Sequence, residues 1–233
     1  MTVCAGPLST KVAVVLTLLL GVVVNIVRSV WSPDALDPLL TIALGVAVAV
    51  IALRAAMTVD ELGLARASMR AGLRWSLGVI VVVVVGLAIA ALVPATRSFL
   101  EDDRTQISFG SMLWQALVVI PIATVVVEEL VFRGVLLGLF QRLFSPRRAL
   151  VVCAVVFGLW HLLPVWRGGG AGDLSGDGDI GRLGAVAGTF VATFVAGLGF
   201  GWLRQRASSL IAPICAHVAT NSATLAAAWF VAR

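Results

Sequence analysis

The residues of this chain best able to do chemistry are polar side chains set inside apolar stretches. The segments ATVVVEELVFRGVLLGLF, VVFGLWHLL and APICAHVATN carry six of them: Glu128, Glu129, Arg133, His161, His217 and Asn221. The two histidines are the only histidines in the sequence. A charge at membrane depth costs roughly 2.5–3.5 kcal/mol on insertion scales, so a charged residue in such a stretch indicates a functional site.

The segment around the two glutamates can hold both a neutralised and a free carboxylate. Glu129 and Arg133 are four residues apart, so they share one face of a helix and can pair. Glu128 points about 100° away around the helix and is not neutralised by the same partner. A carboxylate left free in a pocket of low dielectric suits general base work. An ordinary ion pair at a membrane–water boundary is the alternative, and it stays open.

The histidines have helical neighbours that suit a hydrolytic site. His217 and Asn221 are four residues apart and point the same way, so an imidazole and a carboxamide could donate together to a developing oxyanion. Phe157 lies one turn before His161, where it could form a wall of the pocket. A hydrogen-bonded core histidine is the alternative at each position. Two histidines together with a glutamate pair favour one shared site, because each group would otherwise need its own buried partner.

The elements that position these residues are membrane-spanning helices. Apolar residues make up 60% of the 233 residues and charged residues only 12%, whereas a soluble domain is about half apolar. Several apolar runs reach the roughly 17–25 residues that a spanning helix needs. We predict an all-α, polytopic transmembrane helical bundle that forms a single integral membrane domain over residues 1–233. It has about seven spans, within limits of about six to eight: 11–28, 38–56, 75–94, 109–141, 148–166, 183–204 and 208–231.

Three segments depart from simple spans. The fourth span, 109–141, is too long only to cross the membrane, so it should project, tilt or break near Pro121. Residues 60–74 carry three arginines at intervals of four, which predicts an interfacial amphipathic helix on an anionic leaflet. The segment Gly168–Gly181 is rich in glycine and aspartate and predicts a flexible hydrophilic loop. A calcium-binding loop is disfavoured there because the glutamate at its twelfth position is absent.

Charge alternates from loop to loop. Basic residues lie between spans two and three, four and five, and six and seven: Arg54, Arg66, Arg70, Arg74, Arg142, Arg147, Arg148, Arg204 and Arg206. The intervening loops carry aspartate and glutamate instead. The positive-inside rule then predicts a cytoplasmic amino terminus and an outside carboxyl terminus, in what we expect to be a bacterial cell membrane. Basic residues are not interleaved with exposed aromatics, so the expected partners are membrane lipids and no nucleic acid.

Three motifs on separate spans follow one another in an order that resembles a known family. They are Glu128-Glu129-x-x-x-Arg133, Phe157-x-x-x-His161 and His217-x-x-x-Asn221. Their order and spacing are similar to those of the CPBP family of CAAX-processing and bacteriocin-processing intramembrane endopeptidases, also called the type II CAAX protease or Abi family. The resemblance covers about half of the chain, which suggests a CPBP-like catalytic core over 109–228.

The resemblance implies an enzyme that hydrolyses peptide bonds inside the membrane. On this basis Glu128 and His161 would activate a water molecule. His217 and Asn221 would stabilise the tetrahedral oxyanion, while the second glutamate and Arg133 would organise the site. The substrate would be a membrane-associated or lipidated peptide, such as a prenylated CaaX peptide or a bacteriocin-type peptide.

The family is commonly labelled metalloprotease, so a zinc mechanism is the alternative. Zinc would be held by His161 and His217 with one glutamate, and the other glutamate would act as base. We expect a water-activating Glu/His site with no obligatory cofactor. Two further functions stay open: a non-catalytic membrane scaffold or immunity protein, and a proton-coupled transporter, which also uses intramembrane Glu and His.

Overall fold

Membrane-spanning helices dominate the computed structural model, which describes residues 7–31, 36–93, 106–167 and 179–233. Seven helical stretches in these ranges are long and apolar enough to cross a membrane: Thr10–Val30, Asp37–Arg54, Arg66–Leu92, Phe109–Leu143, Pro146–Trp166, Ile180–Ala207 and Ile211–Val231. The predicted polytopic helical bundle is therefore confirmed, and the chain is an integral membrane protein. Most of the glycine-rich segment Gly168–Gly181 lies outside the described residues, so its prediction stays a prediction.

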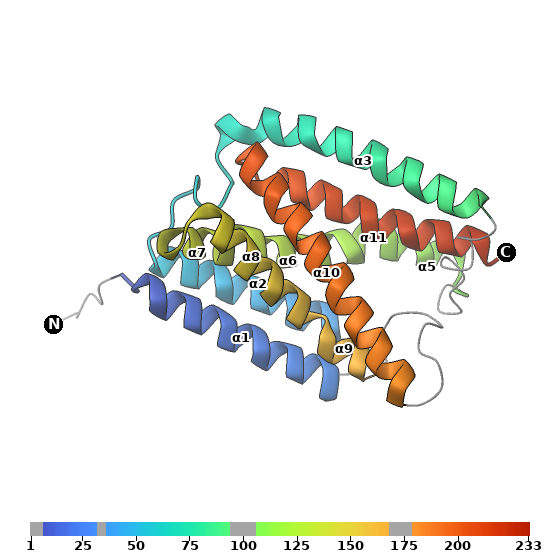
Figure 1. Cartoon of the computed structure of the whole chain (residues 1–233), viewed down its shortest axis with the longest axis horizontal. Coiled ribbons are helices and arrows are strands. Elements are labelled where there is room, and N and C mark those ends of the chain that lie inside the picture. The colour runs from blue at the N-terminus through green and yellow to red at the C-terminus, as the bar shows by residue number, and fades with distance from the viewer. Residues whose placement is uncertain (1–6, 32–35, 94–105, 168–178) are drawn as a thin grey trace.

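The helices pack as neighbours far apart in the sequence. Their bounds are α1 (Thr10–Val30), α2 (Asp37–Arg54), α3 (Met69–Leu92), α5 (Phe109–Trp114), α6 (Val126–Glu129), α7 (Leu137–Leu143), α8 (Pro146–Trp160), α9 (Leu162–Trp166), α10 (Asp179–Ala207) and α11 (Ile211–Val231). Helix α3 runs beside α11 along one edge of the bundle, and α1 packs on α2 near the opposite edge (Figure 1). Helix α10 crosses between them and packs on both α8 and α11. The stretch from α5 to α7 runs through the middle of this arrangement (Figure 1).

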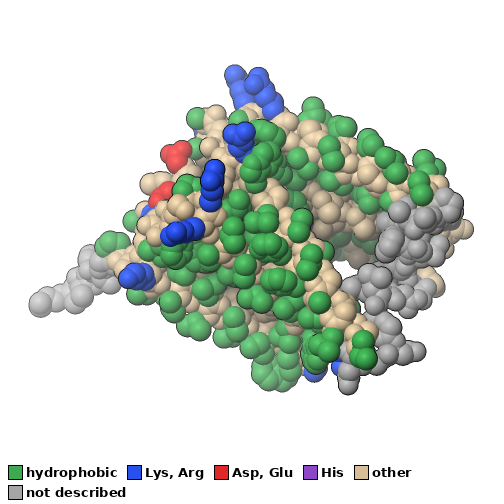
Figure 2. Space-filling view, viewed as in Figure 1, with side chains coloured by type: hydrophobic (Ala, Val, Ile, Leu, Met, Phe, Trp, Pro, Cys, Tyr) green, Lys and Arg blue, Asp and Glu red, His purple; other side chains and the backbone are tan. Residues whose placement is uncertain are grey.

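The surface follows the sequence pattern of apolar spans with basic ends. Figure 2 shows apolar side chains over most of the visible face and Lys and Arg side chains gathered at one end of the bundle. Arg70, Arg74, Arg147 and Arg148 are exposed, at the beginnings of α3 and α8. An apolar girdle with a basic end is what a lipid bilayer requires.

The fourth span does not break at Pro121, which was one of the three outcomes predicted for it, and its projection or tilt stays a prediction. It continues from Phe109 to Leu143 because two π-helical segments, Gln115–Val125 and Leu130–Leu136, replace part of the α-helix. In the first, the N–H of Val126 donates to the carbonyl oxygen of Pro121, five residues earlier. The break was expected on the assumption of α-helical hydrogen bonding, with which proline interferes; the wider turns of a π-helix accommodate it.

The separate amphipathic helix predicted over residues 60–74 is not present. Turns occupy residues 59–63, a 3₁₀ turn covers Arg66–Ser68, and α3 begins at Met69, so the second half of the segment is the start of a span. Gly63 has a φ of 74°, a left-handed conformation that favours glycine and stops a helix. A Cβ at this glycine would also clash with the guanidinium of Arg204, which is hydrogen-bonded to the same turn.

Two arginines from distant helices hold this turn in place. Arg142 donates to both carboxylate oxygens of Glu61, at 2.6 and 2.8 Å, and to the carbonyl oxygens of Ala55 and Ala56. Arg204, which is buried, donates to the carbonyl oxygens of Asp60 and Glu61. The α2–α3 connection is therefore attached to the ends of α7 and α10, and these contacts explain why it forms turns instead of a free amphipathic helix.

The Glu61–Arg142 pair predicts a stability that depends on pH. Hydrogen bonds from Arg142 lower the pKa of Glu61 from 4.5 to about 2. The stability that the ion pair contributes is therefore complete above about pH 4.5 and is lost as the pH falls towards about 2. Because the pair is partly exposed, we expect Glu61→Gln to lower the free energy of unfolding by about 1 kcal/mol near pH 7.

Thermal unfolding of the purified protein in detergent, followed from about pH 7 to about pH 3, measures this effect. The difference between parent and Glu61→Gln should shrink as the pH falls. Asp60→Asn is the matched control, since Asp60 is exposed and its side chain makes no hydrogen bond within the described residues. A difference that stays constant across this range would contradict the assignment.

Candidate active site

A buried ion pair lies at the centre of the bundle, where α6 meets α11. Glu129 is fully buried, and one of its carboxylate oxygens, Oε1, accepts hydrogen bonds from Arg133 at 2.9 Å and from Nδ1 of His217 at 2.8 Å. The spacing of four residues predicted the first contact. The second joins residues 88 positions apart and brings a histidine of the last span onto the glutamate motif of the fourth.

The other glutamate faces the same histidine from its opposite edge. Oε2 of Glu128 lies 4.0 Å from Nε2 of His217, and Oε1 of Glu128 accepts a hydrogen bond of 3.2 Å from the indole N–H of Trp160. The imidazole of His217 therefore lies between the two carboxylates, with one ring nitrogen towards each. A single side chain with two nitrogens can serve two adjacent glutamates that point about 100° apart on their helix.

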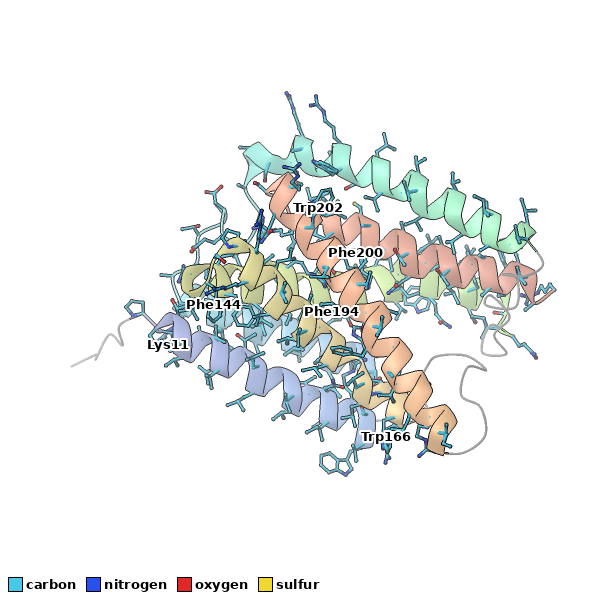
Figure 3. The ribbon with its side chains drawn as sticks, in the orientation of Figure 1. Lys11, Phe144, Trp166, Phe194, Phe200 and Trp202 are labelled. Carbon is cyan, nitrogen blue, oxygen red and sulfur yellow. The ribbon has the colours of Figure 1, made fainter. Side chains whose placement is uncertain are left out.

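Aromatic rings enclose the charged groups. The guanidinium of Arg133 lies over the ring of Phe157 at 3.9 Å and of Phe200 at 5.2 Å, which favours the cation. Phe200 also stacks on His217, with ring centroids 4.8 Å apart and an angle of 23°. Phe200, on α10, is about halfway along the bundle in Figure 3, so the site lies between the two ends and not at either of them.

His161 occupies a break between two helices. Helix α8 ends at Trp160 and α9 begins at Leu162, and the N–H of His161 donates to Gly158 only three residues earlier. The carbonyl of Phe157 is thereby free for the side chain of His161, whose Nδ1 lies 2.8 Å away. A carbonyl can only accept, so Nδ1 carries the proton and Nε2 of the neutral ring has the free lone pair.

The structure brings the predicted residues together to different degrees. The two glutamates, Arg133 and His217 are in direct contact, and His161 is linked to them through Phe157, whose ring lies 4.6 Å from His161 and 6.1 Å from His217. Phe157 therefore contacts both histidines, and its role as a wall of the pocket stays a prediction. Asn221 lies one turn beyond His217 on α11, half-buried; in the described part of the chain its side chain makes no hydrogen bond.

The donor atoms do not form the zinc site that the alternative mechanism requires. Within the described residues, no group of three His, Cys, Asp or Glu side chains is placed to hold a metal ion. Nδ1 of His217 bonds to Glu129 and Nδ1 of His161 bonds to a backbone carbonyl, an arrangement that leaves Nε2 of each ring available and is also usual for histidine ligands of a metal. The described residues do not bring His161, His217 and a glutamate together as one ligand set, and no chemical step is assigned to a metal here.

Sequence reasoning missed three residues of the site. Trp160 immediately precedes the predicted His161 and holds Glu128, while Phe200 covers both Arg133 and His217. The third is Asn25 of α1, whose side-chain amide donates to the carbonyl of Trp160. An amide inside the apolar run LLLGVVVNIV was a detectable signal for Asn25. The aromatic residues had none, because tryptophan and phenylalanine are ordinary residues of a spanning helix.

This fold and site define a class: polytopic helical membrane proteins with a buried Glu–Arg–His cluster between their spans. Residues 110–223 match the profile of the family described as type II CAAX prenyl endopeptidase Rce1-like. The chain belongs to this family over that stretch, about half of its 233 residues, which contains all six predicted site residues and confirms the resemblance seen in the motifs. Neither a curated protein nor a solved structure matches the chain. Membership of this family supports a CAAX-type intramembrane protease in general.

Removal of the guanidinium should destabilise the protein strongly. Arg133→Met keeps much of the side-chain volume but leaves Glu129 with an uncompensated buried charge, which costs about 3–5 kcal/mol. The double variant Glu129→Leu/Arg133→Met removes both charges of the pair and should recover part of that loss, although Nδ1 of His217 then lacks its acceptor. Thermal unfolding in detergent measures both, with Arg147→Met at an exposed position as control. If the single variant melts at the parent temperature, the buried pair contributes nothing to the fold.

Proposed function

We propose that this protein is an intramembrane endopeptidase that hydrolyses a peptide bond with a water molecule activated by Glu128. The observation that carries this proposal is the position of His217, buried between the carboxylates of Glu128 and Glu129. An imidazole in this position can donate a hydrogen bond to the peptide carbonyl, while the carboxylate of Glu128 accepts a proton from the water. The family match over the same residues supports the reaction class.

The gap between Glu128 and His217 suits the attacking water. At 4.0 Å, Oε2 and Nε2 are too far apart for a hydrogen bond, but a water about 2.8 Å from each fits between them at an angle near 90°. The indole of Trp160 already holds Oε1 of Glu128, so Oε2 is the oxygen that faces the water. In this mechanism Glu128 takes the proton from the water and passes it to the leaving amine.

His217 then serves the oxyanion. The buried cluster contains two carboxylates and one guanidinium, so a proton on His217 balances its charges. Protonated His217 donates through Nδ1 to Glu129, and its Nε2–H points to the reacting centre. Asn221 is one turn away on α11 and is the second donor that we propose for the tetrahedral oxyanion.

His161 provides a second acceptor. Its Nε2 lone pair is fixed because the other ring nitrogen donates to the carbonyl of Phe157. We propose that this lone pair, together with Glu128, orients the water, as the family resemblance implies. Glu129 and Arg133 hold His217 in place and do not touch the reacting atoms.

The proposed substrate is a membrane-associated peptide that carries a lipid, with a prenylated CaaX peptide as the first candidate and a bacteriocin-type peptide as the second. We propose that it reaches the site from the cytoplasmic leaflet, because the fourth span continues from the glutamates towards the basic end of the bundle. This orientation puts the amino terminus in the cytoplasm and the carboxyl terminus outside.

Cysteine labelling tests the orientation. A cysteine at Arg147, in a variant with the three native cysteines replaced, should react with a membrane-impermeant maleimide only after the cells are opened. A cysteine at Arg233 in the same background should react in intact cells. Labelling of position 147 in intact cells would overturn the orientation and, with it, cytoplasmic access.

Peptide cleavage by the purified protein in liposomes tests the function. Glu128→Gln and His161→Ala should each reduce the cleavage rate by about 10²–10⁴-fold, the usual contribution of a general base and its partner. Thr220→Val is the matched control, because Thr220 is exposed on α11 next to Asn221 and its hydroxyl donates to its own helix. The substrates are prenylated and unmodified forms of the same peptide.

Two outcomes would change the conclusion. A folded parent protein that cleaves no peptide of the panel, or a Glu128→Gln variant that cleaves at the parent rate, would contradict the proposal and favour a non-catalytic scaffold. Rigorous metal removal addresses the zinc alternative: activity that survives it excludes an obligatory metal, whereas loss that zinc restores would establish one.

A further inference from the structure

A polar residue of α1 reaches the active site from outside the stretch that matches the family. Asn25 is 8% exposed, and its Nδ2 donates a hydrogen bond of 2.7 Å to the carbonyl oxygen of Trp160, 135 residues away. The family match begins at residue 110, so nothing in that match assigns a role to the first three spans. A buried amide in a lipid-bathed helix is costly unless it is hydrogen-bonded, so this contact defines how α1 sits against α8.

The local sequence explains why this carbonyl is available. In a continuous helix, the carbonyl of Trp160 would accept from the N–H of residue 164, but residue 164 is proline and has no N–H. The helix breaks at His161, and the amide of Asn25 takes the place of the missing backbone donor. The break thus frees two carbonyls: that of Phe157 binds the His161 ring, and that of Trp160 binds Asn25.

Two further contacts make the arrangement specific. The hydroxyl of Ser29, one turn along α1, donates to Oδ1 of Asn25 at 3.3 Å, which orients the amide so that its NH₂ group faces Trp160. One turn before Asn25 is Gly21, where a Cβ would lie 3.8 Å from the indole ring of Trp160. Trp160 is therefore seated on α1 through both its ring and its carbonyl, and its indole N–H extends to Glu128.

We infer that Asn25 is a positioning residue of the reaction. It acts through Trp160: by holding the backbone of Trp160 at the helix break, it aims the indole N–H at Oε1 of Glu128 and keeps Oε2 towards the water. This inference rests on the proposed function, because it explains how the proposed base is oriented.

The test compares Asn25→Leu, which keeps the shape of the side chain but removes the donor, with a matched change on the same helix. Thr17→Val is that control: Thr17 is buried on α1, and among the described residues its hydroxyl donates only to Ala13 of its own helix. We expect Asn25→Leu to lower kcat about tenfold with KM changed less than about twofold, because orientation of the base affects the transition state and not substrate binding. Thr17→Val should leave both constants at the parent values.

Trp160→Phe tests the second link and keeps the inference falsifiable if Asn25→Leu folds poorly. It retains an aromatic ring but loses the N–H that holds Glu128. The two changes interrupt one chain of contacts, so Asn25→Leu/Trp160→Phe should be no slower than the slower single variant. Multiplied rate losses in the double variant would show that Asn25 acts by another route.

Fluorine NMR of protein labelled with 5-fluorotryptophan separates failure of this inference from failure of the proposed function. The chain has seven tryptophans, and Trp160→Phe identifies the line of Trp160 by its loss. Asn25→Leu should move that line and leave the other six in place, while Thr17→Val should move none. An unmoved Trp160 line, or a moved line with parent kcat, overturns the inference. A moved line in a protein that cleaves no peptide overturns the proposed function alone.

Discussion

The fold depends on one buried carboxylate, that of Glu129. A charge at this depth is tolerated only with partners, and the partners come from two directions: Arg133 from the next turn of the same helix and His217 from the last span. The guanidinium of Arg133 is in turn shielded from water and lipid by the rings of Phe157 of α8 and Phe200 of α10. Four parts of the chain therefore meet at one ion, and their relative positions follow from its requirements.

The π-helical segments explain how one span accommodates both proline and this cluster. Pro121 lacks a backbone N–H in either kind of helix, but its ring crowds the tighter turn of an α-helix, whereas a π-helix bonds residues five apart and has a wider turn. The two π-helical segments leave only a short α-helical stretch, Val126–Glu129, between them, and both glutamates lie at its end. Segments of this kind are frequent at functional sites, where they re-aim side chains that a regular helix would direct elsewhere.

Features that depend on residues close together in the sequence could be predicted, whereas features that depend on contacts between distant residues could not. Hydropathy finds spans because lipid acts on each helix separately, and all seven predicted spans correspond to helices. The Glu129–Arg133 pair needs only the helical repeat. Of the three outcomes predicted for the long fourth span, the break at Pro121 does not occur, because π-helical hydrogen bonding, which the α-helical pattern does not anticipate, carries the helix past the proline. The amphipathic helix at 60–74 was wrongly predicted because Arg142 and Arg204, distant in sequence, hold that segment as turns.

To predict the contacts at the helix break near His161, both the local sequence and the packing of distant helices must be known. Pro164 is visible in the sequence and predicts an unpaired carbonyl four residues earlier, at Trp160. Asn25 is also visible, as an amide in an apolar run, and its NH₂ group bonds outside its own helix. Neither shows which unpaired group meets which, because that depends on how α1 packs against the segment where α8 ends and α9 begins. Yet an orphan acceptor in one span and an orphan donor in another each carry a desolvation cost, and pairing removes both costs together. In membrane proteins, where water is not available to bond unpaired polar groups, contacts between spans can therefore be predicted by pairing an unpaired donor in one span with an unpaired acceptor in another.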